Sequence, residues 1–173
     1  MKRKSWIPAI AVLAAITVMP AVPAAAAQWE TGIAPASTAV QAQASFSAKE
    51  YQSAVLRLVN QQRTVRSLKP LTVTAAMDGI AAVRAKEASV RFSHTRPDGS
   101  NPSSLFAQRK IAFSSAGENL AYGYRSPEAL VSAWMSSPEH RSNLLSARFT
   151  NTGIGAYQSA DGKIYCAQLF SRP

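Results

Sequence analysis

The order of the helix and strand signals along the chain limits the fold most. Two apolar segments near the C-terminus, residues 152–158 and 163–170, are joined by Ser159-Ala160-Asp161-Gly162. An Asp-Gly pair between such segments favours a β hairpin. Helix start signals come earlier, at Ser47, Ser126 and Ser137. Helices first and a strand pair last indicate an α+β domain rather than alternating parallel β-α units.

Three serines mark predicted helix starts. Ser47 and Glu50 form a capping box. Ser126-Pro127-Glu128 combines a cap, a proline in the first turn and an acidic residue near the positive end of the helix dipole. Ser137-Pro138-Glu139 repeats this signal and places His140 in the first turn of a short helix. The predicted helices cover residues 47–67, 74–89 and 103–110, then start at 126 and 137, with a short strand at 111–114.

The N-terminus has the features of a secretory signal peptide. Lys2, Arg3 and Lys4 precede an apolar run at residues 7–18, and four alanines end at Ala27. We expect cleavage near Ala27 and a mature protein that is secreted or associated with the cell wall. A membrane anchor is the alternative, but the apolar run is shorter than the roughly 20 residues of a span. The mature protein is therefore expected to have no transmembrane span.

Composition divides the rest of the chain into a spacer and one domain. Residues 28–46 are rich in Ala, Gln, Ser, Thr and Pro and predict a flexible spacer. Residues 47–173 have the length of one ordinary domain. Cys166 is the only cysteine, so no disulfide can form within the chain. Its apolar surroundings in the sequence predict a buried core residue rather than a nucleophile.

The chain is strongly basic, with 19 Lys and Arg against 9 Asp and Glu and a net charge of +10, and removal of Lys2, Arg3 and Lys4 with the signal peptide would leave 16 − 9 = +7. Such a surplus favours anionic partners, for example envelope polymers or lipid head groups. The basic residues are scattered and form no run interleaved with aromatic residues. A solvated basic surface is therefore the first interpretation, and no nucleic-acid partner is expected.

The only two histidines, His94 and His140, lie in separate polar clusters, with Glu118 between them in the sequence. Two His and one Glu are a ligand set for zinc that leaves a fourth position open for water. Without a metal, the same groups can act as general acid and base. The alternative is that each histidine only satisfies a turn or a backbone group, as we expect of Asn119 and Asn143. The spacing alone does not separate these interpretations.

The order of these motifs resembles the CAP superfamily of cysteine-rich secretory, antigen 5 and pathogenesis-related proteins, also called the SCP domain. The resemblance rests on four motifs in order: Phe92-Ser93-His94 with Asp98-Gly99-Ser100, Gly117-Glu118-Asn119-Leu120-Ala121, the segment 134–145 around His140, and the segment 149–155. It covers residues 47–170 and is similar to the short, disulfide-free bacterial branch. It implies an α–β–α sandwich with a central antiparallel sheet and a cleft that holds a His/Glu tetrad.

Carried over by position, His94, Glu118 and His140 match three members of that tetrad. The fourth, a glutamate in animal members, falls near Ser137, with Glu139 as an adjacent substitute. The resemblance thus implies a site for Zn²⁺ or another divalent metal at these three residues, with Glu139 as a further candidate ligand. The same three residues are the candidates for a catalytic role, with Glu139 or a nearby carboxylate as the base of a hydrolase.

We predict a binding module at the cell envelope, whose ligand is a lipid, a peptide or a cell-wall component. A metal-dependent, peptidase-like hydrolase that uses the same cleft is the alternative. Binding is preferred over catalysis because the tetrad is one ligand short. A third interpretation, a basic wall-adhesion protein, needs only the charge and the spacer.

Overall fold

The computed structural model describes residues 45–173 and the backbone of residues 5–8, which form a five-stranded sheet and five helices. The elements are β1 (Ser5–Pro8), α1 (Ala48–Thr64), β2 (Thr72–Val73), α2 (Ala75–Val90), α3 (Ser103–Gln108), β3 (Ser115–Tyr122), α4 (Pro127–Ser136), α5 (Pro138–Leu144), β4 (Asn151–Gln158) and β5 (Ile164–Arg172). The strand order is β1-β3-β5-β4-β2.

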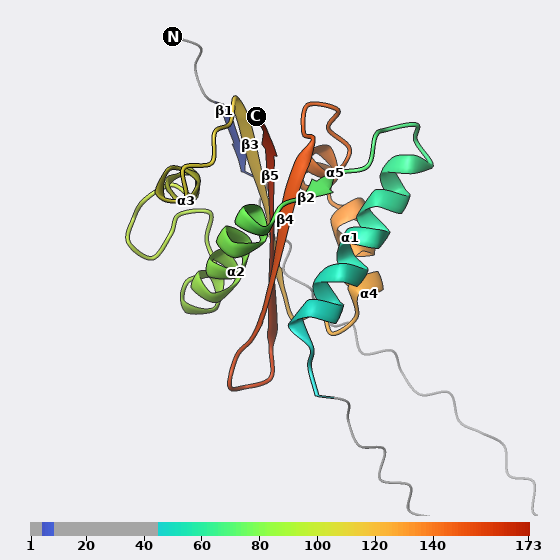
Figure 1. Cartoon of the computed structure of the whole chain (residues 1–173). Helices are drawn as coiled ribbons and strands as arrows, with labels where there is room; N and C mark the ends of the chain where they lie inside the picture. The colour runs from blue at the N-terminus through green and yellow to red at the C-terminus, as the bar shows by residue number, and fades with distance from the viewer. Residues whose placement is uncertain (1–4, 9–44) are drawn as a thin grey trace, which may run out of the picture.

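The sheet has an antiparallel centre and parallel edges. β5 pairs antiparallel with both β3 and β4, and the predicted hairpin is the β4–β5 connection. β2 and β1 add short parallel pairings at the two edges. Helices α2 and α3 lie on one side of the sheet and α1, α4 and α5 on the other (Figure 1). This arrangement confirms the predicted α–β–α sandwich with a central antiparallel sheet.

The N-terminal predictions fall mostly outside the described residues. The spacer lies almost entirely outside them, as does the signal peptide except for β1. In the full chain, β1 pairs with β3 from Ser5 opposite Ser115 to Pro8 opposite Glu118. Among the helices of the described part, none has the length and apolarity to span a membrane.

Two close approaches of the backbone set the spacing between α2 and the sheet. A Cβ atom on Gly153 would lie 2.1 Å from the Met77 carbonyl oxygen, and one on Gly155 would lie 2.0 Å from that of Ala81. Both glycines belong to β4, so the absence of their side chains lets α2 lie directly against this strand. Small buried residues on α2, Ala81 and Ala85 among them, complete this contact.

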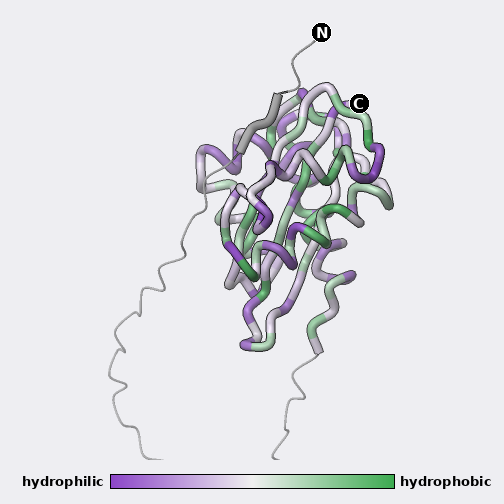
Figure 2. Tube along the Cα trace, turned by 90° about the vertical axis from the view of Figure 1, so that its left-hand side faces the viewer, coloured by the Kyte–Doolittle hydropathy of each residue, from purple (hydrophilic) through white to green (hydrophobic). Residues whose placement is uncertain are grey.

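The core fills both sides of the sheet. One cluster joins α1 and α4 to the sheet around Val55, Leu130 and Trp134, and another lies under α2 and α3 around Ile80 and Phe106. Hydrophobic stretches run through the body of the trace, and many hydrophilic ones mark its turns (Figure 2). Cys166 is buried as predicted, and its burial raises the pKa of the thiol, so the uncharged form is favoured.

The predicted helix starts are confirmed, but α3 ends at Gln108 rather than at residue 110, and two further boundaries differ from prediction. The hydroxyls of Ser47 and Ser126 accept the backbone N–H groups of Glu50 and Ala129. Helix α1 ends at Thr64 rather than at residue 67. The strand predicted at 111–114 is wrong: β3 begins at Ser115, because the Ile111 N–H instead bonds the Phe106 carbonyl at the end of α3.

Candidate functional site

Glu118 lies in the middle of β3 with its side chain fully buried, and both of its carboxylate oxygens are bonded. Arg84 on α2 donates from Nε to Oε2 at 2.7 Å and from Nη2 to Oε1 at 3.2 Å. A two-pronged contact of this kind fixes the plane of the carboxylate as well as its charge. Arg84 is itself 0% exposed, so the interpretation of its charge as part of a solvated surface is wrong.

His94 is held by the same carboxylate. Its Nδ1 atom lies 2.7 Å from Glu118 Oε1. A carboxylate only accepts hydrogen bonds, so Nδ1 carries a hydrogen, and in the uncharged form of the ring Nε2 would then present a lone pair. Nε2 is buried and has no hydrogen-bond partner among the described residues. Arg84 also donates to the Ser93 carbonyl at 2.8 Å, which anchors the segment that carries His94.

His140 lies in the first turn of α5 and has a different support. Its Nδ1 atom is 2.8 Å from the Ser137 hydroxyl, and its ring stacks on Trp134 at a centroid distance of 6.3 Å. Burial lowers the pKa of His140 to about 4; repulsion from nearby His94 in its protonated form adds to the shift, and the Leu120 backbone, which lies close without forming a hydrogen bond to the ring, opposes it. The Nε2 atom is again buried without a partner in the described part of the chain.

Two asparagines join α5 to β3 beneath the histidines. Asn119 donates to the His140 carbonyl at 3.1 Å. Asn143 donates to the Glu118 carbonyl at 3.2 Å and to the Asn119 side-chain oxygen at 3.0 Å. All three bonds are buried, so the predicted role of these asparagines in satisfying backbone groups is confirmed.

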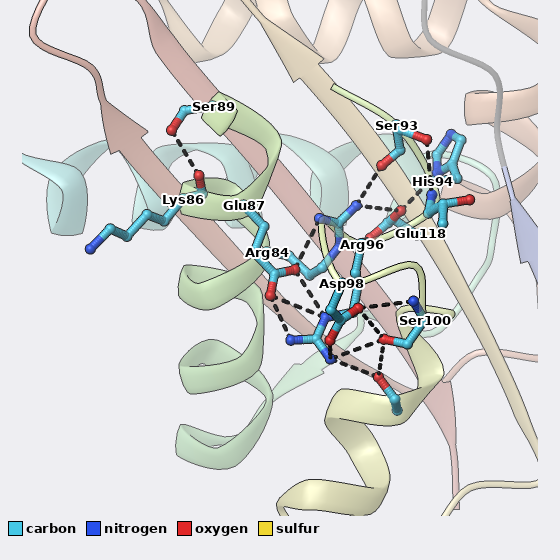
Figure 3. A network of polar contacts seen from close by, with 12 residues as sticks. Arg84, Lys86, Glu87, Ser89, Ser93, His94, Arg96, Asp98, Ser100 and Glu118 are labelled. Carbon is cyan, nitrogen blue, oxygen red and sulfur yellow. Dashed lines mark hydrogen bonds and ion pairs between the residues drawn. The ribbon is translucent and has the colours of Figure 1, made fainter. Parts of the chain in front are cut away.

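A second layer of charges ties the loop after α2 to the helix itself (Figure 3). Glu87 accepts from Arg84 at 3.3 Å and from Arg96 at 2.6 Å. Arg96 also reaches Asp98 at 3.3 Å and donates to the Ser104 hydroxyl at 2.8 Å. The loop that carries His94 is therefore held at both ends by arginines.

The candidate ligands are not all equally available. Glu118 is committed to Arg84 and His94, and Glu139 is exposed on α5. In the described residues, no group of three or more His, Cys, Asp or Glu is arranged to hold a metal ion. Two buried imidazole Nε2 atoms remain, each on a ring fixed through its Nδ1. A ring nitrogen oriented by a bond to its other nitrogen is typical of metal-ligating histidine.

Sequence reasoning missed two of the supporting residues, Arg84 and Ser137. Arg84 follows Ile80 and Ala81 on the buried face of α2 at helical spacing, so its position in the period was a usable signal. Ser137 stands where the resemblance places the fourth tetrad member, and its hydroxyl contacts the histidine there. The Ser137-Pro138-Glu139 pattern indicates a helix start, but it gives no signal that the Ser137 hydroxyl bonds His140 rather than capping the helix.

Comparison with known proteins supports the family resemblance that the sequence motifs indicated. The model of the Cysteine-rich secretory protein family, CAP, matches residues 56–170. The uncharacterized protein YkwD of Bacillus subtilis is 33% identical over 137 residues, which are 78% of this chain and 52% of YkwD. The uncharacterized membrane protein YlbC of the same organism is 32% identical over 81 residues, 47% of this chain and 22% of YlbC. The chain thus spans about half of one relative and about a fifth of the other.

Solved structures agree in fold. An extracellular protein containing an SCP domain from Bacillus anthracis superimposes with a TM-score of 0.67 at 26% identity, covering 73% of this chain and 41% of that one. An outer surface protein from Borrelia burgdorferi gives a TM-score of 0.68 at 21% identity, covering 73% of this chain and 96% of that one. At that identity the second likeness concerns the fold alone.

Proposed function

This chain belongs to the CAP family of cysteine-rich secretory proteins. From that premise we propose that it is a binding module of the cell envelope. We propose further that His94 and His140 bind a divalent metal such as Zn²⁺. The observation that carries the proposal is the pair of buried, unpartnered Nε2 atoms within the described residues. A buried polar atom without a partner costs free energy, and a ligand that supplies the partner offsets that cost.

The surrounding residues prepare the two rings for such a role. Glu118, held by Arg84, keeps the hydrogen of His94 on Nδ1 and leaves the Nε2 lone pair free. Ser137 orients His140, and burial keeps that ring uncharged at neutral pH. A neutral imidazole is the form that binds a metal. A bound Zn²⁺ would act as a Lewis acid for an oxygen or nitrogen ligand in the remaining positions.

A binding role is favoured over a metal-dependent hydrolase by the state of Glu118. Hydrolysis at a metal needs a base to take a proton from water. Among the described residues, Glu118 is the one carboxylate that is hydrogen-bonded to either histidine, and Arg84 and His94 already occupy both of its oxygens. The geometry therefore supports a site that holds a ligand, with a lipid, a peptide or a cell-wall component as the candidate classes.

An envelope location is supported by a relative and by the N-terminal sequence. One structural relative, at 26% identity, is an extracellular protein. The signal-peptide features of residues 1–27, and the net charge of 16 − 9 = +7 on the residues that follow them, agree with export to a surface rich in anionic polymers.

The test is a Zn²⁺ titration by calorimetry on the full chain and on single variants. We expect one ion per chain with micromolar affinity, lost in His94→Ala and in His140→Gln. Glu118→Gln is expected to weaken binding about 10- to 100-fold, because it changes the group that orients His94. Glu139→Gln, at an exposed carboxylate beside His140, is the control and should leave affinity unchanged.

Circular dichroism of each variant separates loss of the site from loss of the fold. A folded wild-type chain that does not bind Zn²⁺, Co²⁺ or Ni²⁺ would overturn the metal proposal. Binding that survives in both folded histidine variants would place the metal elsewhere and overturn it as well.

A further inference from the structure

A cavity of about 380 Å³ lies at the end of α1, and none of its lining residues belongs to the histidine site. Its walls are Arg63 of α1, the connection after it with Ser67 and Lys69, the loop after α5 with Thr150, and Arg172 at the end of β5. The volume is within the range of small-molecule sites, roughly 300–1,000 Å³. Three cationic side chains thus line one cavity that has no acidic residue in its wall.

Arg63 gives this cavity a fixed positive charge. The residue is only 2% exposed, and its guanidinium donates to four backbone carbonyls. They belong to Lys69 at 2.9 Å, Leu144 at 2.7 Å, Ser146 at 3.0 Å and Phe149 at 3.4 Å. A guanidinium has five N–H groups, so these bonds leave one hydrogen on Nη2.

The charge of Arg63 has no counter-ion in the described structure. No carboxylate lies within ion-pair distance of its nitrogen atoms in residues 45–173, and burial lowers its pKa. Carbonyl dipoles compensate part of a buried charge, but an unpaired buried ion remains costly. An anion in the adjoining cavity would reduce that cost.

The rim of the cavity offers further donors for an anion. Lys69 and Arg172 are exposed, and neither forms an ion pair within the part of the chain that the structure describes. Ser67 and Thr150 add hydroxyl groups to the same wall. Guanidinium, ammonium and hydroxyl donors around one space suit a tetrahedral oxyanion with several acceptor oxygens.

We propose that this cavity binds a phosphate group, with Arg63 as its floor and Lys69 and Arg172 as its rim. The site is independent of the histidine pair. Its three cationic residues give part of the chain's excess positive charge a specific binding role. Its ligand is either a small phosphate ester or the phosphodiester backbone of an envelope polymer. Both present the same oxygens, and the experiment distinguishes them.

The test titrates the full chain with inorganic phosphate, followed by NMR and calorimetry. The double variant Lys69→Gln/Arg172→Gln removes the rim and leaves the structural bonds of Arg63 intact. Its matched control is Lys86→Gln/Arg109→Gln, which removes the same charge from exposed positions on α2 and just after α3. We expect the rim variant to bind phosphate about tenfold more weakly or worse, because it loses two charge-assisted contacts, and the control to change less than about twofold.

If the two double variants lost phosphate affinity equally, binding would reflect only the general positive charge of the surface, and the proposed site would be overturned. Phosphate that binds no better than chloride would overturn it too. Competition by poly(glycerol phosphate), lost in the rim variant alone, supports the polymer as ligand. Phosphate binding without such competition supports a small phosphate ester. Zn²⁺ affinity should stay unchanged in the rim variant. Failure of the phosphate site and failure of the histidine site can therefore be distinguished.

Discussion

At the scale of single residues, His140 couples the stability of the domain to pH. Its pKa is about 4 in the folded chain against an ordinary value of 6.5. Between these values the unfolded chain binds a proton that the folded chain does not, so acidification favours unfolding. We expect metal-free protein to lose about 3 kcal/mol of unfolding free energy from this group between about pH 7 and pH 4.

Urea unfolding curves at several pH values measure this loss. His140→Gln keeps a polar side chain beside Ser137 but cannot titrate, so its stability should fall less steeply over the same interval. Parallel slopes for the two proteins would contradict the assignment of the linkage to His140.

Arg84 is the second residue whose substitution should strongly lower the free energy of unfolding. Arg84→Met leaves the Glu118 carboxylate buried beside His94 without its cation. Breaking a buried pair from one side costs about 3–5 kcal/mol. Thermal and urea unfolding measure the effect, and Arg109→Met, at an exposed position, should change stability by less than about 0.5 kcal/mol. If Arg84→Met were as mild as this control, Glu118 would not depend on Arg84.

At the scale of elements, the contact between α2 and β4 depends on glycine. Gly153→Ala would place a Cβ atom 2.1 Å from the Met77 carbonyl oxygen, and backbone cannot move aside as a side chain does. We expect a loss of about 3 kcal/mol, the upper end of the usual cost of overpacking, measured by urea unfolding.

The matched control is Gly79→Ala, the same substitution on α2 where no atom lies within 4 Å of the new Cβ. There alanine should stabilise the helix by about 1 kcal/mol through its higher helix propensity. A similar small effect at both positions would show that α2 can shift away from the sheet at low cost.

At the scale of the whole molecule, the net charge of +10 predicts salt-sensitive adhesion. Binding of the full chain to isolated bacterial envelopes should fall steeply between about 0.1 M and 1 M salt, because the screening length drops from about 10 Å to about 3 Å. Sedimentation with envelopes measures it. Retention that does not depend on salt would contradict charge-driven adhesion and favour recognition by a shaped site.

Much of the fold was predictable because its signals are local. A cap such as Ser47 acts on the next few residues, and Asp161-Gly162 favours its own hairpin. The short edge pairing of β2 with β4 was not predicted, since Thr72 and Val73 form a strand only where Asn151 and Thr152 already lie. A segment of two residues is too short to show the alternation of apolar and polar residues that predicts a strand.

The sequence by itself determined the α+β class, the family and the choice of His94 and His140 as candidate site residues. Each of these depends only on residue type and order. Only the tertiary structure decided which charges are buried and what they contact. Arg84 meets Glu118 from 34 residues away, and Arg63 meets the Leu144 carbonyl from 81 residues away. In the sequence, helical spacing places each arginine on the buried face of its helix, but no local signal identifies its partner. Their roles arise from packing, since a charge removed from water depends on whichever partners the folded chain brings to it.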